Sequence, residues 1–195
     1  MDKTRAYYDR SAPQLEHRKL ACALDREETT SILSSVPEGI DSVLDVGCGT
    51  GHLLDEVRCR MRTGVDFSAS MLRLARDRSP GLRLVLADGT RLPFGDSSFQ
   101  VVTCQDVIGH LPDAGMMASE IIRCCAPKGR IIVTANAKSL ASRVLSRYVL
   151  ARTGLRLRSY RPDELQKIFE VSGGEVLSSE LLRGSLVKLI ASPRE

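Results

Sequence analysis

The stretch Val-Leu-Asp-Val-Gly-Cys-Gly-Thr-Gly, residues 43–51, decides the fold of this 195-residue chain. An apolar run typical of a buried strand leads into a turn that has glycine at every second position, at Gly47, Gly49 and Gly51. Glycine lets the backbone approach a ligand closely, and the N-terminus of a following helix presents unpaired N–H groups. A tight turn alone needs fewer glycines, so the stretch predicts a ligand site at a strand–helix junction.

Position 52 separates two kinds of nucleotide cofactor. A dinucleotide fingerprint has the spacing GxGxxG, which requires glycine at this position, but the residue is His52. The chain has GxGxG instead, preceded by the acidic residue Asp45. This pattern resembles motif I of the class I S-adenosylmethionine-dependent methyltransferases. An NAD(P)-dependent dehydrogenase is therefore the less favoured interpretation.

Outward from this stretch, short apolar runs alternate with amphipathic stretches. The expected strands are 42–46, 62–65, 83–87, 100–105, 130–135, 175–182 and 185–191, the last two forming a hairpin around Arg183-Gly184. The expected helices are 4–35, 51–59, 69–78, 113–126, 136–157 and 162–171, with the fourth stopped by Pro127-Lys128-Gly129. Strand–helix alternation with short loops predicts a parallel sheet covered on both faces.

The resemblance sharpens this expectation to a Rossmann-like, doubly wound α/β sheet of seven strands, mostly parallel with an antiparallel last strand. We expect one methyltransferase domain over residues 1–195. Within it we expect an N-terminal helical cap at 1–39, a cofactor-binding core at 40–135, a basic helical insert at 136–161, and a C-terminal helix and strand pair at 162–195.

The same resemblance implies a set of cofactor-binding residues. Asp66 ends the second strand at the position that faces the cofactor ribose in doubly wound folds. The pair Asp88-Gly89 follows the third strand, where the family has an acidic side chain on the adenine amino group. Asp45 is expected to orient the methionyl amino group, and Gln105 to lie beside the sulfonium. The predicted set is Tyr8, Asp45, Gly47, Cys48, Gly49, Gly51, Asp66, Phe67, Asp88, Gly89 and Gln105.

Two further segments resemble this family. The opening Tyr7-Tyr8-Asp9-Arg10-Ser11-Ala12 is similar to the "YYD..A" start of the ubiquinone/menaquinone branch, whose N-terminal helix lies over the cofactor. Residues 92–102 resemble the "LPF…D.SFD.V" run that leads into the fourth strand. Gln100 stands where the family usually has Asp, at a position that we interpret as structural.

The resemblance implies methyl transfer to oxygen, carbon or nitrogen of a small-molecule acceptor. S-adenosylmethionine carries a good leaving group, so the protein supplies binding, alignment and water exclusion. A base is useful only where the acceptor must lose a proton. His110 is the best candidate base, because it follows the fourth strand at the edge where open α/β sheets bind ligands. The alternative interpretation is a loop histidine that caps the next helix.

Composition excludes several classes of protein. Aromatic residues are 4% and Trp is absent, which argues against stacked carbohydrate or single-stranded nucleic-acid platforms. The six cysteines include no CxxC pair, so no metal site is predicted. No apolar leader or spanning segment is visible, which predicts a reduced, cytoplasmic protein.

A basic segment follows the fifth expected strand. Between residues 138 and 161 there is no Asp or Glu, and the basic residues are Lys138, Arg143, Arg147, Arg152, Arg156, Arg158 and Arg161. Leu140, Val144, Tyr148 and Ala151 recur at helical spacing, so the stretch is amphipathic. Three interpretations stay open: a solvated face, a cap that attracts an anionic acceptor, and a contact with a membrane surface or nucleic acid.

Two other functions also stay open. One is an RNA- or protein-directed methyltransferase that uses the Arg-rich insert. The sequence lacks the Asn/Asp-Pro-Pro-aromatic motif by which many methyltransferases hold a nucleobase, and this absence disfavours nucleobase methylation. The other is a non-catalytic module that binds the cofactor and regulates a partner. The sequence does not determine the acceptor, the atom methylated or the oligomeric state, because these depend on the shape of the cap and loop sequences carry that information poorly.

Overall fold

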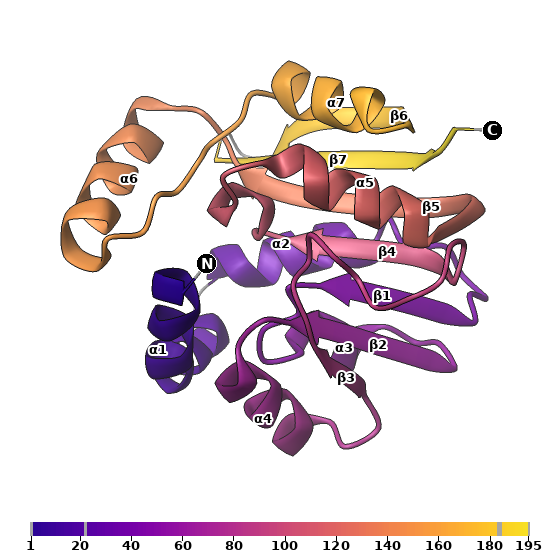
Figure 1. The fold of residues 1–195 in the computed structure, drawn as a ribbon, viewed down its shortest axis with the longest axis horizontal. Coiled ribbons are helices and arrows are strands. Elements are labelled where there is room, and N and C mark those ends of the chain that lie inside the picture. The colour runs from indigo at the N-terminus through magenta and orange to yellow at the C-terminus, as the bar shows by residue number, and fades with distance from the viewer. Residues whose placement is uncertain (1, 22, 183–184, 195) are drawn as a thin grey trace.

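A single sheet with strand order β3-β2-β1-β4-β5-β7-β6 organises the protein (Figure 1). The computed structural model describes residues 2–21, 23–182 and 185–194. Its strands are β1 Ser42–Val46, β2 Met61–Asp66, β3 Arg83–Leu86, β4 Phe99–Gln105, β5 Cys125–Asn136, β6 Gly174–Leu182 and β7 Leu186–Pro193. Strands β1 to β5 pair in parallel, whereas β7 runs antiparallel to both β5 and β6. The predicted mostly parallel sheet with an antiparallel last strand is confirmed.

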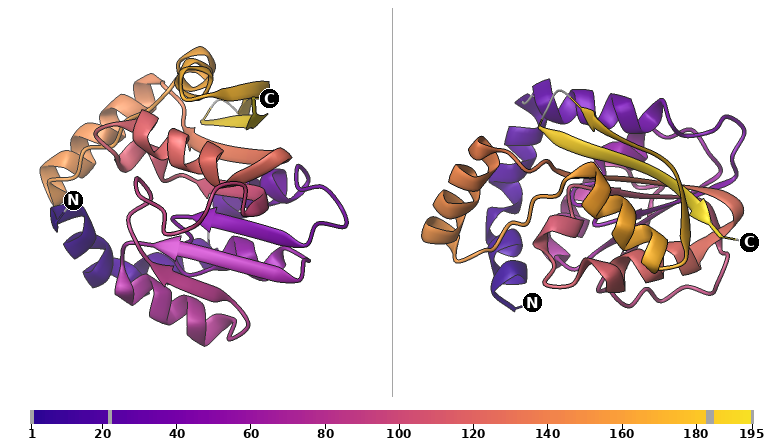
Figure 2. Two further views of the ribbon diagram at one scale, coloured as in Figure 1. Left: turned by 45° about the vertical axis from the view of Figure 1, so that its right-hand side comes forward. Right: turned by 90° about the horizontal axis from the view of Figure 1, so that it is seen from above.

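Helices cover both faces of this sheet. They are α1 Asp2–Ala21, α2 Ala23–Leu33, α3 His52–Glu56, α4 Ala69–Arg78, the short 3-10 helix η1 Ile108–His110, α5 Ala114–Cys124, α6 Leu140–Thr153 and α7 Pro162–Val171. Apolar residues of α5 and α7 pack in one buried cluster, and those of α2, α3 and α4 pack in a second. Viewed from above, α5 and α7 lie on one side of the strands and α2 on the other (Figure 2).

The central strands are apolar on both sides because both faces of the sheet are covered. Every residue of β1 is buried, and neighbouring residues enter opposite clusters: Val43 packs with α2 and α3, and Leu44 packs with α5. The same alternation continues in β5, where Ile131 and Ile132 belong to different clusters. This double burial explains why the strands are near-continuous apolar runs in the sequence.

The ends of several elements differ from the predicted ones. Helix α5 ends at Cys124 and β5 begins at Cys125, so Pro127-Lys128-Gly129 lies inside the strand rather than at a helix stop. The register shifts between Phe99 and Val101, which pair with Cys125 and Arg130, so the extra residues are absorbed by an irregular strand start. The turn at 183–184 lies outside the described residues.

Three predicted helices also have different ends. The N-terminal stretch is divided between α1 and α2, and α3 ends at Glu56 rather than at residue 59. Helix α6 begins only at Leu140, after a capping box between Ser139 and Ser142. It ends at Thr153 and is followed by the C-cap residue Gly154, whose φ of 73° is left-handed. Capping therefore shortens α6 at both ends relative to the apolar pattern.

The carboxyl ends of the parallel strands meet at one edge of the sheet, where open α/β sheets bind ligands. Helices α1 and α6 both lie beyond this edge (Figures 1 and 2). Gln100 lies at the opposite edge, where its side-chain oxygen accepts bonds from the backbone N–H groups of Asp41, at 2.6 Å, and Ser42, at 3.3 Å. Its predicted structural role follows from these contacts.

Candidate active site

The glycine turn after β1 approaches the next strands closely. Gly47 and Gly49 have positive φ values of 78° and 53°, which L-residues with side chains rarely adopt. A Cβ atom on Gly47 would collide with the side chain of Val107. The N–H groups of Gly47 and Cys48 both donate to the carbonyl of Val65, at 2.7 and 2.9 Å. The turn is therefore fixed to the end of β2 by its own backbone.

The carboxylate of Asp66 holds two loops together at this edge. Its Oδ2 accepts from the N–H of Gly49 at 2.9 Å, and its Oδ1 accepts from the N–H of Ser68 at 2.8 Å. Ser68 in turn caps α4, because its hydroxyl accepts from the N–H of Met71. Asp66 is buried, and these charge-assisted bonds hold its carboxylate in the wall of a cavity at the carboxyl edge of the sheet.

Helix α1 is tied to the same loop. Oδ1 of Asp9 accepts from the Ser68 hydroxyl at 2.6 Å and from the N–H of Ser70 at 3.2 Å. These bonds bring the preceding residue, Tyr8, over the loop, where its ring lies edge-on to Phe67 with centroids 5.9 Å apart. The sequence predicted an N-terminal helix over the ligand site, and α1 has this position.

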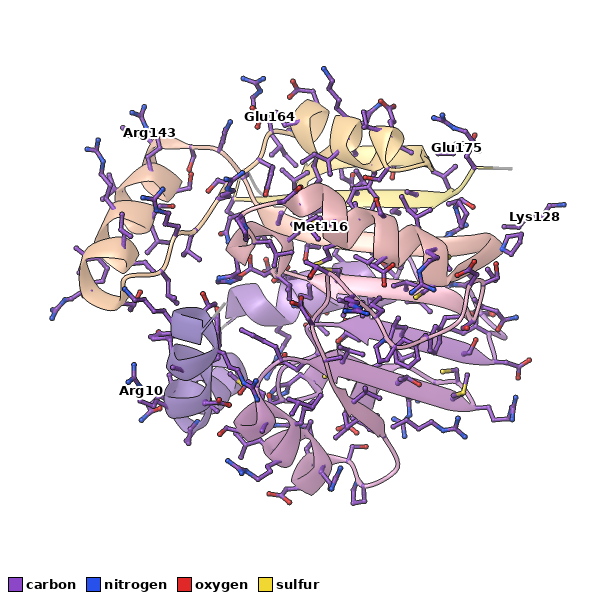
Figure 3. The ribbon with its side chains drawn as sticks, viewed as in Figure 1. Arg10, Met116, Lys128, Arg143, Glu164 and Glu175 are labelled. Carbon is purple, nitrogen blue, oxygen red and sulfur yellow. The ribbon has the colours of Figure 1, made fainter. Side chains whose placement is uncertain are left out.

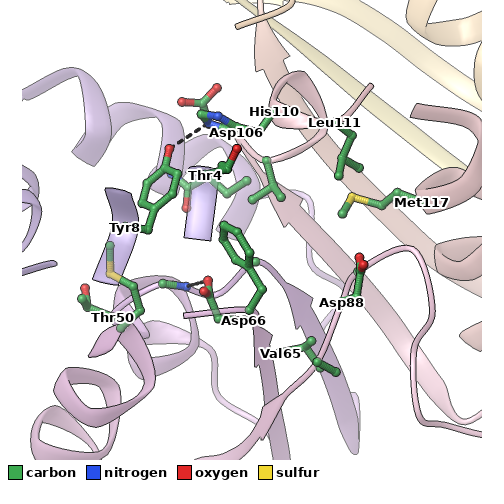
Figure 4. Close-up of a pocket in the computed structure, with 18 of the residues that line it drawn as sticks. Thr4, Tyr8, Thr50, Val65, Asp66, Asp88, Asp106, His110, Leu111 and Met117 are labelled. Carbon is green, nitrogen blue, oxygen red and sulfur yellow. Dashed lines mark hydrogen bonds between the residues drawn. The ribbon is translucent and has the colours of Figure 1, made fainter. Parts of the chain in front are cut away.

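A cavity of about 230 Å³ lies between the glycine turn, α1 and the loop after β4 (Figure 4). It is far larger than a single water needs, roughly 10–15 Å³. The sequence-predicted site residues in its wall are Tyr8, Gly47, Gly49, Asp66, Phe67, Asp88, Gly89, Gln105 and His110. They come from five separate segments of the chain, and the fold brings all of them to one cavity.

Three residues of the predicted set are outside the wall. Asp45 is 2% exposed and accepts a bond from the Thr103 hydroxyl at 2.7 Å, within the sheet. Cys48 packs over Gly64 of β2, and Gly51 is the N-cap of α3 with φ 78°. None of these three residues lines the cavity, so a direct contact with a ligand stays a prediction for each.

The wall also contains residues that sequence reasoning missed. They include Thr4, Glu28, Thr50, Met71 and Met117. Asp106, for which the sequence left open a solvated, a helix-capping or a wall position, does line the wall. Thr50 lies inside the quoted glycine stretch and was available as a signal. Glu28 was not, because an acidic residue on a polar helix is normally solvated, and only the packing of α2 buries it.

The charge of the wall is one-sided. Its carboxylates are Glu28, Asp66, Asp88 and Asp106, and none of the described residues in the wall is Lys or Arg. Acidic walls attract cations and repel phosphates, and low-dielectric surroundings strengthen both effects. A ligand with a positive centre therefore fits this cavity, whereas the pyrophosphate of a dinucleotide does not.

His110 forms a buried pair with Tyr8. The Tyr8 hydroxyl and Nε2 of His110 are 3.0 Å apart, and the rings are edge-on with centroids at 5.4 Å. Burial lowers the pKa of His110 to about 4, because the cationic ring would lose its hydration. The imidazole is therefore neutral near pH 7, and it reaches the cavity from η1, immediately beyond β4.

Two residues of the wall, Thr50 and His110, each have a buried polar atom without a hydrogen-bond partner in the described part of the chain. These atoms are the hydroxyl oxygen of Thr50 and Nδ1 of His110. Buried polar atoms normally find a partner, so these two point to a polar ligand in the cavity.

Residues 44–133 match a family model described as a methyltransferase domain. This range contains the glycine turn, Asp66, Asp88 and His110. Over this range the chain is similar to methyltransferases. S-adenosylmethionine, the cofactor that the sequence resemblance predicts, carries a sulfonium and an ammonium group, and both suit the acidic wall.

Known proteins agree with this methyltransferase assignment. Demethylmenaquinone methyltransferase from Beutenbergia cavernae is 34% identical over 116 residues, which are 55% of this chain and 45% of the relative. The match thus spans less than half the length of that relative. It confirms the resemblance to the ubiquinone/menaquinone branch.

Solved structures share the methyltransferase fold. A methyltransferase from Thermotoga maritima has a TM-score of 0.81 at 18% identity, covering 96% of this chain and 98% of its own. Magnesium protoporphyrin IX methyltransferase from Synechocystis PCC 6803, solved with bound S-adenosylhomocysteine, has a TM-score of 0.75 at 20% identity and covers 98% of each chain.

Metal-binding clusters and membrane-spanning helices are both absent from the described residues. No group of three or more His, Cys, Asp or Glu side chains among them could hold a metal ion. None of their helices combines the length and apolar character needed to cross a bilayer.

Proposed function

We propose that this protein transfers a methyl group from S-adenosylmethionine to a small-molecule acceptor. The observation that carries the proposal is the one-sided charge of the cavity: four carboxylates and no Lys or Arg among the described wall residues. S-adenosylmethionine supplies a methyl carbon on a cationic sulfur, which is a good leaving group. The residues of the chain then have to bind, align and exclude water.

Different parts of the wall suit different parts of the cofactor. We assign Asp66 to the ribose hydroxyls and Asp88 to the adenine amino group, with the glycine turn against the methionyl and ribose part. Gln105 donates to the Thr29 hydroxyl at 3.4 Å, and the neighbouring Glu28 lies in the same wall. These contacts support an additional role for Glu28 at the cationic end, next to the role predicted for Asp45.

His110 and Tyr8 are the polar groups that we assign to the acceptor. A neutral imidazole can accept a hydrogen bond from an acceptor hydroxyl or donate one to a carbonyl. With a pKa near 4 it is too weak a base to remove a proton in advance, so proton loss would have to accompany methyl transfer. We therefore propose that His110 positions the acceptor and takes its proton only as the new bond forms.

Apolar wall residues favour an acceptor with an apolar body. Leu111 and Met117 lie between His110 and Asp88 (Figure 4), and Val107 lines the same cavity. The relative from Beutenbergia cavernae is a demethylmenaquinone methyltransferase. Aromatic and quinone-type rings with a free carbon or hydroxyl are therefore the first compounds to include in a panel of candidate acceptors.

Calorimetric titration with S-adenosylmethionine, S-adenosylhomocysteine and NADH tests the cofactor. We expect both adenosyl ligands to bind and NADH not to bind. The variant Asp88→Asn keeps an oxygen for Thr90, whose N–H and hydroxyl both bond Oδ1 of Asp88, so it should fold and lose at least about tenfold in affinity. Asp77→Asn, on the exposed side of α4, is the matched control.

Turnover with the acceptor panel tests the activity itself. Methylation of a ring acceptor by the wild type, lost in His110→Ala with cofactor binding retained, is the expected result. Tight cofactor binding without turnover on any acceptor would favour the non-catalytic module instead. Failure of both adenosyl ligands to bind would refute the proposal.

A further inference from the structure

Helix α6 exposes its apolar residues to solvent. Leu140 is 76% exposed, Val144 63% and Tyr148 58%, and no residue of α6 is buried. The helix projects beyond the carboxyl edge of the sheet, and Arg143 points away from the body of the molecule (Figures 1 and 3). A surface helix normally turns its apolar side inward, so α6 is the reverse of the usual arrangement.

The position of each residue around α6 shows how complete this reversal is. At about 100° per residue, Leu140, Val144, Tyr148 and Ala151 share one sector of roughly 80°. All four are exposed. The half-buried residues are Ser142, Ser146, Val149 and Thr153, and they lie on the opposite side of the helix. The side of α6 that faces the protein body thus carries mainly hydroxyl groups, and the side that faces the solvent carries a stripe of apolar side chains.

Arginines flank the apolar stripe on both sides. Arg143 and Arg147 border it on one side and Arg152 on the other, where its guanidinium lies 5.6 Å from the centre of the Tyr148 ring. At the two ends of the segment, Lys138 forms an ion pair with Glu164, and Arg161 forms ion pairs with Asp163 and Glu164. No carboxylate pairs with the three flanking arginines in the described part of the chain.

We propose that α6 docks in the interface of an anionic lipid bilayer, with its apolar stripe among the acyl chains and its arginines on the lipid phosphates. Lys and Arg can extend their charged groups to the headgroups while their stems cover apolar surface. Charge complementarity identifies the partner, because arginines favour anionic lipids, each by about 1 kcal/mol near the surface, which corresponds to roughly fivefold in binding. This surface goes beyond methyl transfer and does not depend on which acceptor is used.

Other occupants fit less well. Nucleic acid would contact the arginines but would leave the apolar stripe against phosphates and water. A second copy of the chain related by a two-fold axis would bring the arginines of both helices together without a carboxylate between them.

The two ends of α6 are anchored beside the active site. The N–H of Arg158 donates to the carbonyl of Gly109 at 2.8 Å, next to His110. The N–H of Tyr160 donates to the carbonyl of Asn136 at 2.8 Å, and the N–H of Lys138 donates to that of Tyr160 at 2.9 Å. Docking of α6 would therefore bring the carboxyl edge of the sheet to the lipid surface, with the cavity in a fixed relation to it.

Vesicle co-sedimentation tests the proposal with the full chain. We expect binding to vesicles of equal parts phosphatidylcholine and phosphatidylglycerol, much weaker binding to phosphatidylcholine alone, and weakening by salt. Val144→Ser should reduce binding by about tenfold, because a buried apolar side chain contributes roughly 1.5–3 kcal/mol. Val171→Ser is the matched control, since Val171 is 79% exposed on α7.

Charge is tested in the same assay. Arg147→Gln should weaken binding to the anionic vesicles by about fivefold, whereas Lys128→Gln should not, because Lys128 lies at the opposite end of the molecule (Figure 3). Titration with S-adenosylmethionine checks that each variant is folded and separates a failure of this proposal from a failure of the proposed function.

Three results would overturn the proposal. The first is no binding of the wild type to the anionic vesicles, and the second is equal binding by Val144→Ser. The third is a dimer in light scattering that Val144→Ser dissociates, which would assign the stripe to a second copy. RNA binding that depends on Arg147 but not on Val144 would equally assign the segment to a polyanion.

Discussion

At the scale of single residues, the cavity depends on a few backbone conformations that only glycine adopts without strain. Gly47 and Gly39 have nearly the same φ, 78° and 73°, but very different surroundings. Gly47 faces Val107 at the base of the cavity, whereas nothing lies within 4 Å of a Cβ atom on Gly39. Substitution of these two glycines therefore separates the cost of a strained backbone, which both share, from the cost of a collision with a neighbouring side chain, which only Gly47 has.

We predict that Gly47→Ala destabilises the protein by at least about 2 kcal/mol, because the left-handed backbone costs about 1–2 kcal/mol and the collision with Val107 adds to it. Gly39→Ala should cost only the backbone part. Chemical unfolding measures both, and calorimetry should show lost cofactor affinity for Gly47→Ala alone. Equal losses in the two variants would mean that close approach at Gly47 is unimportant.

His110 predicts a pH dependence of stability. Its pKa is lowered to about 4 in the folded state, against about 6.5 in the unfolded chain, so the unfolded chain binds more protons between these values. The neutral ring therefore contributes fully to the free energy of unfolding above pH 6.5. This contribution, about 3 kcal/mol in total, is lost as the pH falls toward 4.

Urea unfolding across this pH range measures the effect in the wild type and in His110→Gln. The variant should lose less stability than the wild type on acidification, because Gln has no proton to gain. Parallel pH curves for the two proteins would contradict the lowered pKa of His110. Turnover should likewise show no step near pH 6.5 from this residue.

At the scale of elements, α1 is held over the cavity by one carboxylate. Asp9 binds Ser68 and Ser70 at the start of α4, and these bonds keep its pKa below the usual range. The ion pair of Asp9 with Arg5 is longer, 3.9 Å, and its side chains are partly exposed, so it contributes little.

We therefore predict that Asp9→Ala frees α1 and weakens cofactor binding, whereas Arg5→Ala does neither. Hydrogen exchange of the α1 amides should rise in Asp9→Ala, because local opening no longer breaks the bonds to α4. Asp9→Asn keeps an acceptor oxygen and should restore most of the protection. Unchanged exchange in Asp9→Ala would show that other contacts hold α1 in place.

At the scale of the whole molecule, the cavity joins segments from both halves of the sheet. A ligand that binds only the native state should therefore stabilise the entire fold. We predict that S-adenosylmethionine at 100 times its Kd adds about 2.7 kcal/mol and raises Tm by roughly 5–10 °C. Differential scanning calorimetry measures this shift. NADH at the same concentration should leave Tm unchanged, and an equal shift with NADH would contradict the charge argument.

The sequence by itself determined the sheet, and it determined the glycine turn and two of the carboxylates in the cavity wall. Strand β1 and helices α4 and α7 have the predicted ends, because a doubly covered parallel sheet requires apolar runs and because turn and capping residues mark the helix ends. The glycine turn, Asp66 and Asp88 were predictable because the carboxyl ends of parallel strands must meet at one edge. The division into cap, core, insert and C-terminal part stays a prediction.

Only the tertiary structure decided which of the candidate residues contact the cavity. Asp45 turns to Thr103 inside the sheet, and Glu28 is buried in the wall although its helix is polar. The outward stripe of α6 was equally hidden, because an amphipathic pattern gives the angle between two faces and not which of them faces the protein. Periodicity is a property of the local chain, whereas burial depends on which distant segment packs against it.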